Sequence, residues 1–314
     1  MGDYLKIVFF GTPDFAVPAF KSLLNSDFEM SAVVTQPDRQ SGRGRKMRPC
    51  PVKAEALSVG LKVLQPERVK DKKFIDELFS IKPSAIVVVA YGQILPPEII
   101  HLPEYGCVNI HASLLPRYRG ASPVNMAIIK GDKVTGVSTM LMDEGMDTGP
   151  VLIQEEVEVR PDDTAGTLSW RLSKKGADLI IPTLRALSNG AVKPKPQTGE
   201  PSYAPVFKKS DGLIDWTKSS DMLINFVRGM NPWPGAFSFL GAERIKILSA
   251  VAVDGVADAG IIDAVTKDSL FIGTGQGILS VLELQTPGKP AMPIKAFLQG
   301  RNIKPGMRFD KQDD

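Results

Sequence analysis

The chain is poor in the residues on which many scaffolds and metal centres depend. It has two cysteines, Cys50 and Cys107, and two histidines, His101 and His111. Two cysteines without a C-x-x-C spacing exclude a disulfide framework and favour a reducing compartment, the bacterial cytoplasm or an organellar matrix. Because histidines are few and no H-E-x-x-H motif occurs, a metal centre would need scattered carboxylates, and we predict no metal.

Long hydrophobic runs and an excess of one charge are also missing. No apolar run approaches the ~18 residues that span a bilayer, and the start does not read as a signal peptide, so no membrane association is expected. Lys and Arg number 38 against 35 Asp and Glu, a net charge of +3. This small net charge excludes a strongly basic, histone-like protein, and it does not identify a binding partner. The 314 residues are enough for about two domains, and we expect a monomer.

A glycine-rich dinucleotide fingerprint is missing too. Residues 5–10 form a buried apolar run that ends at Gly11, but Pro13 stands where a second glycine belongs and lacks an N–H donor. The next apolar run ends at Gln36, without the carboxylate that would bind a ribose. We therefore expect a Rossmann-like topology without a nicotinamide or flavin cofactor.

Alternating apolar runs and helical patterns fill the first part of the chain. Residues 30–34, 85–90 and 107–111 predict buried strands of a parallel sheet that is covered on both faces. A long helix is predicted from Thr164, and the proline-rich segment 189–207 reads as a linker. Short runs broken by glycine follow, as in a small barrel. The predicted fold class is α/β, with a Rossmann-like domain over residues 1–188, the linker, and a C-terminal OB-like β-barrel domain over residues 208–314.

One predicted strand carries a pair of polar side chains near its end. Asn109 and His111 are two residues apart, so their side chains leave the same face, and ligands of α/β sheets bind at the carboxyl ends of strands. An amide can stabilise a developing oxyanion and an imidazole can transfer a proton, which suits acyl transfer. The alternative is that His111 satisfies a hydrogen bond in the core and Asn109 caps a turn.

A turn over residues 142–150 concentrates three carboxylates, Asp143, Glu144 and Asp147. Carboxylates so close together repel one another unless a cation, a hydrogen-bond network or a ligand engages them. One of them reaching His111 would orient the imidazole and stabilise its protonated form. Ser113 as a nucleophile is an alternative, but it lacks the strained elbow of the hydrolases that use one.

These segments resemble the formyltransferases that use 10-formyltetrahydrofolate. The resemblance rests on Asn-Ile-His-Ala-Ser-Leu-Leu-Pro at 109–116 and on Asp-Glu-Gly-Met-Asp-Thr-Gly at 143–149. It implies that Asn109, His111 and Asp147 are catalytic and that 10-formyltetrahydrofolate is the formyl donor. The residues that it assigns to the folate pocket are Tyr91, Gly92, Ile94, Leu95, Ser113, Leu114, Leu115, Pro116, Asp143 and Glu144.

Three further segments resemble the members of this family that formylate methionyl initiator tRNA. They are residues 9–16, the basic stretch 36–53, and Asn-Pro-Trp-Pro-Gly at 231–235. The resemblance covers nearly the whole chain and implies an enzyme that makes N-formylmethionyl-tRNA for translation initiation. The alternatives are a sugar-nucleotide formyltransferase and a formyltetrahydrofolate hydrolase of the same family, or a non-catalytic RNA-binding module.

The cations are gathered in two places. Six cations and no acid lie between Arg39 and Lys53, in what reads as a flexible loop, and a second basic set lies between Lys289 and Lys311. Such runs are usually solvated surface, but the first follows a strand at the predicted active-site edge, where it would meet phosphates. The residues expected to bind tRNA are Arg39, Arg43, Arg45, Lys46, Arg48, Lys209, Lys289, Arg301 and Lys304.

Overall fold

The computed structural model describes residues 5–41 and 46–310, which form two compact units. The first unit contains the chain up to residue 123 together with residues 134–158 and 169–204, and the second contains residues 124–133, 159–168 and those from 205 on. Within the described residues, every helix is too short or too polar to cross a membrane. Each unit has its own sheet and its own buried core.

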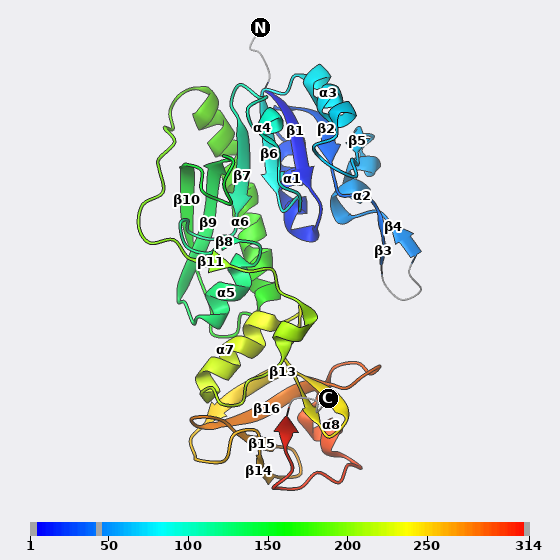
Figure 1. Cartoon of the computed structure of the whole chain (residues 1–314), viewed down its shortest axis with the longest axis vertical. Helices are drawn as coiled ribbons and strands as arrows, with labels where there is room; N and C mark the ends of the chain where they lie inside the picture. The colour runs from blue at the N-terminus through cyan, green and yellow to red at the C-terminus, as the bar shows by residue number, and fades with distance from the viewer. Residues whose placement is uncertain (1–4, 42–45, 311–314) are drawn as a thin grey trace. The chain divides into compact units, whose positions relative to one another are not determined.

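A seven-stranded sheet forms the centre of the first unit, in the order β10-β9-β7-β6-β1-β2-β5 (Figure 1). Five strands run parallel, and β9 and β10 continue the sheet in antiparallel pairs. The predicted α/β, Rossmann-like class is thereby confirmed. The bounds are β1 (Lys6–Gly11), β2 (Glu29–Val34), β5 (Val63–Leu64), β6 (Ala85–Val89), β7 (Cys107–His111), β9 (Val134–Leu141) and β10 (Val151–Glu158).

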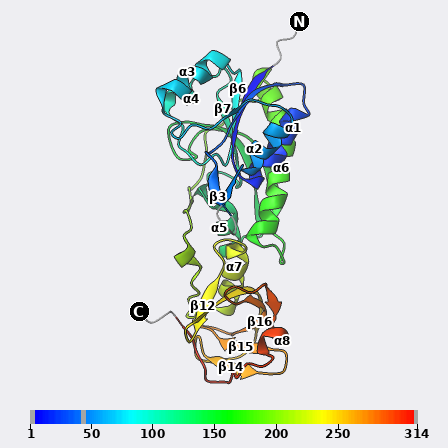
Figure 2. The same cartoon turned by 90° about the vertical axis from the view of Figure 1, so that its right-hand side faces the viewer.

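Helices cover both faces of this sheet. Successive side chains of a strand point to opposite faces, so both sets are buried under helices. Helices α3 and α4 lie on one face, and α1 and α6 lie on the other (Figure 2). Phe10 packs against Phe74 of α3, whereas its neighbour Phe9 packs against Phe20 of α1. The bounds are α1 (Val17–Leu24), after the 3₁₀ turn η1 (Asp14–Ala16), α2 (Pro51–Ser58), α3 (Lys72–Ile81), α4 (Pro97–Ile100) and α6 (Ala165–Ser188).

Two small ladders flank the main sheet. One is the hairpin of β3 (Arg39–Ser41) and β4 (Lys46–Arg48), and the other pairs β8 (Arg119–Gly120) with β11 (Tyr203–Ala204). The hairpin corrects the expectation of one flexible loop from Arg39 to Lys53. Pro51 begins α2, so Lys53 lies on a helix.

The second unit is a curled antiparallel sheet in the order β14-β15-β16-β13-β12-β18, with β17 beside β16. Backbone hydrogen bonds from Ile262 to Met307 and from Phe309 to Gly260, both 2.8 Å, bring the two edges together. This confirms the predicted small barrel. The bounds are β12 (Phe237–Leu240), β13 (Glu243–Val253), β14 (Ile262–Val265), β15 (Leu270–Gly273), β16 (Ile278–Gln285), β17 (Met292–Pro293) and β18 (Phe309–Asp310).

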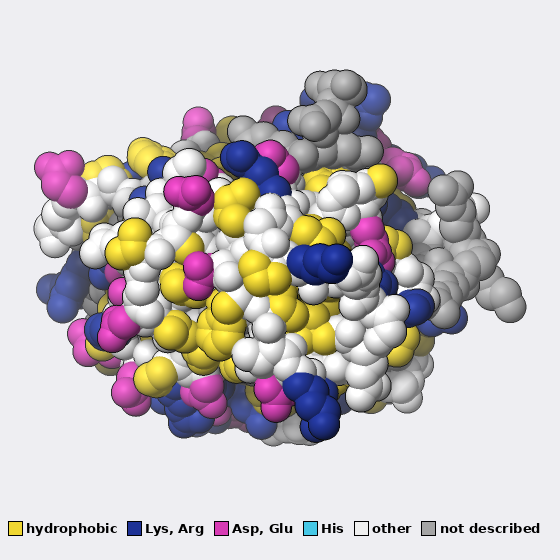
Figure 3. All heavy atoms as spheres, turned by 90° about the horizontal axis from the view of Figure 1, so that it is seen from below, with side chains coloured by type: hydrophobic (Ala, Val, Ile, Leu, Met, Phe, Trp, Pro, Cys, Tyr) yellow, Lys and Arg dark blue, Asp and Glu magenta, His cyan; other side chains and the backbone are white. Residues whose placement is uncertain are grey.

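Helix α7 packs its apolar face against this sheet, with Leu223, Val227 and Met230 in the shared core. Ser219 caps the helix by accepting a hydrogen bond from the Met222 amide. The face of the protein that Figure 3 shows mixes hydrophobic, basic and acidic side chains. The remaining elements are α5 (Pro123–Ile129), η2 (Lys209–Gly212) and α8 (Ile294–Leu298).

Candidate active site

The end of β7 places Asn109 and His111 on the same face of the sheet. The residue between them, Ile110, points the other way, toward Gly176 of α6, where a Cβ would lie 2.6 Å from its Cγ2. The absence of a side chain at Gly176 lets the helix approach the strand closely. Asn109 is half-buried, and His111 is 6% exposed.

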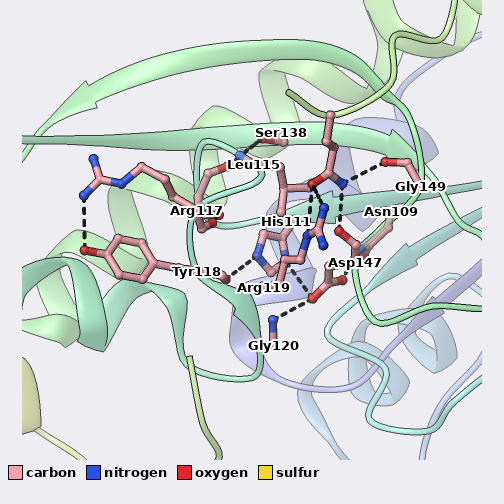
Figure 4. Close-up of polar contacts among 12 residues, drawn as sticks. Asn109, His111, Leu115, Arg117, Tyr118, Arg119, Gly120, Ser138, Asp147 and Gly149 are labelled. Carbon is pink, nitrogen blue, oxygen red and sulfur yellow. Dashed lines mark hydrogen bonds and ion pairs between the residues drawn. The ribbon is translucent and has the colours of Figure 1, made fainter. Parts of the chain in front are cut away.

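Both ring nitrogens of His111 face protein oxygens (Figure 4). Nε2 lies 2.9 Å from the backbone oxygen of Tyr118. A carbonyl oxygen only accepts hydrogen bonds, so Nε2 carries a hydrogen and the neutral ring has its lone pair on Nδ1. Nδ1 lies 3.6 Å from Oδ2 of Asp147. Nδ1 is therefore the nitrogen that can exchange a proton in this site.

Asp147 comes from the turn between β9 and β10 and joins the pair on β7. Its Oδ2 accepts a hydrogen bond of 2.8 Å from the backbone N–H of Gly120, and its Oδ1 lies 3.5 Å from Nδ2 of Asn109. Gly120 has a φ of +113°, and a Cβ there would lie 2.5 Å from the Ala204 oxygen, so a glycine is required. The structure thus brings together the three residues that the sequence predicted as catalytic, and their roles stay a prediction.

The segment after β7 is held internally. Ser113 is buried, and its Oγ donates a hydrogen bond to the Arg117 oxygen. Its own carbonyl accepts from Ser138 Oγ, which in turn accepts from the amide of Leu115. The hydroxyl of Ser113 is thus used to shape the loop, which disfavours the alternative that Ser113 is a nucleophile.

A groove of about 860 Å³ lies between residues 68–70 and 93–97 and is bordered by Glu144, from the turn that also carries Asp147. Three of the residues predicted to bind folate, Ile94, Leu95 and Glu144, line it. The complete lining is Arg68, Val69, Lys70, Gln93, Ile94, Leu95, Pro96, Pro97 and Glu144. Five of these residues are apolar and four are polar or charged, a mixture that can bind an organic ligand.

The other residues predicted for the folate pocket have different surroundings. The ring of Tyr91 is buried edge-on against Phe10, and burial raises the pKa of its hydroxyl above the ordinary value. Asp143 accepts hydrogen bonds from Gly145 and Thr148 within its own turn. The lining of the groove excludes Gly92 and the loop residues Ser113, Leu114, Leu115 and Pro116. Their contact with folate stays a prediction.

The basic hairpin stands on a polar base that we call the hairpin base, made of Asp38, Lys53 and Gln65. Lys53 Nζ lies 2.6 Å from Asp38 Oδ2, and Gln65 donates to Asp38 Oδ1 at 3.0 Å. These two hydrogen bonds hold the pKa of Asp38 below its usual value. Lys53 is therefore engaged within the protein. Above it, Arg39 and Arg48 are exposed and directly opposite one another in the ladder, a like-charge pairing that an anionic partner would relieve.

The remaining residues predicted to bind tRNA differ in exposure. Lys209, Lys289 and Lys304 are exposed in the second unit, whereas Arg301 pairs with Glu243 and stacks over Phe297. Arg43 and Arg45 lie outside the described residues, as does the side chain of Lys46.

Residues 195–204, which we call the strap, were predicted as part of the linker, with no contact to the catalytic residues assigned to them. Gln197 donates hydrogen bonds to the backbone oxygens of Asp147 and Gly149, and Ser202 accepts one from the amide of Tyr118. Sequence reasoning missed both residues, because a proline-rich stretch without apolar periodicity gives no sign of which polar side chain turns inward.

The sequence matches the formyl transferase family over residues 5–184 and the C-terminal domain of formyl transferases over residues 207–302. The chain belongs to the formyl transferase family. A methionyl-tRNA formyltransferase from Thermodesulfovibrio yellowstonii is 49% identical, with 96% of this chain and 97% of that protein covered. The assignment to the methionyl-tRNA formyltransferases that the sequence suggested is thereby confirmed.

Solved structures show the same fold at low identity. A methionyl-tRNA formyltransferase from Clostridium thermocellum is 20% identical with a TM-score of 0.55, covering 83% of this chain and 100% of that chain. The sugar 3N-formyltransferase WlaRD, solved in the presence of dTDP and 5-N-formyl-tetrahydrofolate, is also 20% identical, with a TM-score of 0.65 and coverage of 92% and 100%.

Proposed function

We propose that the protein transfers the formyl group of 10-formyltetrahydrofolate to the α-amino group of methionyl initiator tRNA. The observation that carries the proposal is the assembled corner of Asn109, His111 and Asp147 in a chain that is similar to methionyl-tRNA formyltransferases through both domains. Residues 1–188 would hold the reaction, and residues 208–314 would contribute to tRNA binding.

His111 would move the proton in this reaction. Its Nε2–H is held by the Tyr118 oxygen, so Nδ1 takes the proton that the amine loses as its nitrogen bonds to the formyl carbon. The carboxylate of Asp147 faces Nδ1 and balances the charge of the protonated ring. The same nitrogen can then return the proton to the folate nitrogen as its bond to the formyl carbon breaks.

Asn109 would stabilise the oxyanion that develops on the formyl oxygen. One of its two amide hydrogens points toward Asp147, at a long 3.5 Å, which leaves the second for a substrate oxygen. A donor fixed on a strand needs no reorganisation as charge develops, which is the largest contribution in many acyl transfers.

We expect the groove bordered by Ile94 and Glu144 to bind the folate. Ile94, which is 85% exposed, and the two prolines would offer apolar surface to a pterin ring. When bound, 10-formyltetrahydrofolate supplies an activated formyl group. The hairpin cations Arg39 and Arg48 are exposed for the phosphates of the acceptor arm.

The test is an incubation of the protein with 10-formyltetrahydrofolate and charged initiator tRNA, with His111→Ala as the control. We expect N-formylmethionyl-tRNA and an equal amount of tetrahydrofolate. Tetrahydrofolate without formyl-methionine would indicate the hydrolase, and formylation only of an amino-sugar nucleotide would indicate the sugar-nucleotide enzyme. tRNA binding without any folate turnover would indicate a non-catalytic RNA-binding module. Any of these three results would overturn the proposal.

A further inference from the structure

The strap lies along the catalytic corner and is bonded to it at several points. Lys195 exchanges two backbone hydrogen bonds of 2.8 Å with Val151, next to the turn that carries Asp147. At its other end, Tyr203 pairs with Arg119 and Ala204 pairs with Gly120. These are continuous contacts along the residues that surround His111, which a passive linker would not make.

Gln197 uses its whole side-chain amide in these contacts. Nε2 donates to the Asp147 oxygen at 2.7 Å and to the Gly149 oxygen at 2.8 Å. Oε1 accepts from Nε and Nη2 of Arg119, at 3.1 and 2.7 Å. Both hydrogens and both lone pairs are thus in use, so the amide is fixed in one orientation.

The backbone that Gln197 holds is an unfavourable one. Asp147 has a φ of +52°, a left-handed conformation that costs a residue with a side chain on the order of 1 kcal/mol. Tyr118, whose oxygen binds Nε2 of His111, has a φ of +57°. Its amide is held by Ser202 Oγ at 2.9 Å. The two residues that face the nitrogens of His111 therefore share a strained backbone, and the strap bonds to both.

From this arrangement we propose that Gln197 is a positioning residue for formyl transfer, with Ser202 as its counterpart on the other side of His111. Gln197 holds Asp147 in the conformation that directs its carboxylate at Nδ1, and Ser202 holds the Tyr118 oxygen at Nε2. The proposal rests on the proposed function, because it assigns His111 the proton transfer. A small misplacement of such a group costs up to about 100-fold in rate.

Two substitutions at one position test it. Gln197→Met removes both donors and keeps the length of the side chain, and Gln197→Glu places a carboxylate against two carbonyl oxygens. We expect kcat to fall about tenfold or more in both, with KM for the folate and for the tRNA within about twofold. Thr198→Glu is the matched control, because it adds the same charge on the exposed neighbouring residue and should leave kcat unchanged.

The ring of His111 gives a readout that needs no substrate. The chain has two histidines, so ¹⁵N imidazole resonances can be assigned with His101→Gln. We expect the Nε2–H tautomer of His111 in the unaltered protein and mixed signals in Gln197→Met. If that variant fails to fold, Ser202→Ala is used, with the same expectation. Wild-type kcat with unchanged ring signals would overturn the proposal, as would lost stability and rate with unchanged ring signals. If methionyl-tRNA does not act as acceptor, the proposed function is rejected. The ¹⁵N resonances of His111 would still test whether the strap positions its ring.

Discussion

The corner formed by Asn109, His111 and Asp147 and the hairpin base both follow strands of the same sheet, yet they use carboxylates in different ways. Asp147 is bound by a backbone N–H and faces a buried imidazole. Asp38 pairs with Lys53 at the foot of a hairpin whose arginines are exposed. In the first region, buried contacts orient the carboxylate of Asp147 and the ring of His111. In the second region, the ion pair of Asp38 and Lys53 holds the foot of the hairpin, and the arginines of the hairpin are exposed to solvent.

This difference separates two kinds of kinetic effect. A group that acts only as charge develops changes kcat, whereas a group that binds the substrate before and during the reaction changes KM. We therefore expect substitutions in the corner to lower kcat and substitutions at the hairpin base to raise KM for tRNA.

The largest effect is expected from His111→Ala and Asn109→Ala. Each removes a group expected to act on the reacting atoms. Loss of an oxyanion donor such as Asn109 typically costs ~10²–10³ in rate, and loss of a proton-transfer group such as His111 costs ~10²–10⁴. Single-turnover kinetics should show that loss in kcat, while filter binding shows nearly unchanged affinity for charged tRNA. Turnover near that of the wild type in either variant would contradict the role of the corner.

A second, smaller effect is expected from Gly120→Ala. The new Cβ would lie 2.5 Å from the Ala204 oxygen at a φ of +113°, so the strap or the Asp147 hydrogen bond must shift. We expect a loss of about 1–3 kcal/mol in the free energy of unfolding and roughly tenfold in kcat. Urea denaturation and steady-state kinetics measure both.

Gly199→Ala on the strap is the control for Gly120→Ala. It also has a positive φ, +94°, but no heavy atom lies within 4 Å of the added Cβ. Backbone strain alone would lower the stability of both variants equally and leave kcat unchanged. Equal effects on kcat would show that the close approach of the strap is irrelevant to the corner.

The sequence predicted the corner of Asn109, His111 and Asp147 but not the strap residue Gln197 that contacts it, and the reason is physical. Asn109 and His111 share a strand, so the two-residue period places them together, and the resemblance to formyltransferases selects Asp147 among the three carboxylates of a turn 38 residues away. The contacts that fix this corner come from Gln197, another 50 residues along, in a segment without periodicity. Side-chain contacts over such distances depend on how the chain folds back, which local patterns do not encode.

The hairpin shows the opposite error, in which a local pattern was read too literally. The run of cations from Arg39 to Lys53 was predicted as one flexible loop. Pro51 starts α2, however, and the first turn of that helix directs Lys53 to Asp38. The cations that the described structure leaves exposed on the hairpin, Arg39 and Arg48, are those on its strands.

A moderate effect is expected at the hairpin base from Asp38→Asn. The substitution keeps the shape and removes the charge that holds Lys53, so the hairpin loses part of its support. We expect KM for methionyl-tRNA to rise about fivefold, corresponding to about 1 kcal/mol. The kcat at saturating tRNA and the KM for the folate should change less than twofold. A drop in kcat with unchanged KM would contradict the expectation that the hairpin base affects tRNA binding and the corner affects kcat.

The smallest effect concerns pH. Lys53 and Gln65 lower the pKa of Asp38 in the folded protein, so the stability that this carboxylate contributes is present above the ordinary aspartate pKa and is lost as the pH falls through the lowered value. The unfolding free energies of the wild type and Asp38→Asn should therefore differ by less than about 1 kcal/mol from pH 7 to about pH 4 and converge below it.

Asp76→Asn sharpens that measurement. Asp76 pairs with Lys72 on α3, but the two side chains are 60% and 87% exposed, so solvent screens the pair. Its variant should match the wild type at every pH. A difference for Asp38→Asn that already disappears at pH 6, or one of equal size for Asp76→Asn, would mean that the ion pair with Lys53 does not support the hairpin. The hairpin would then not differ from the rest of the charged surface, because no ion pair would hold its exposed arginines in place.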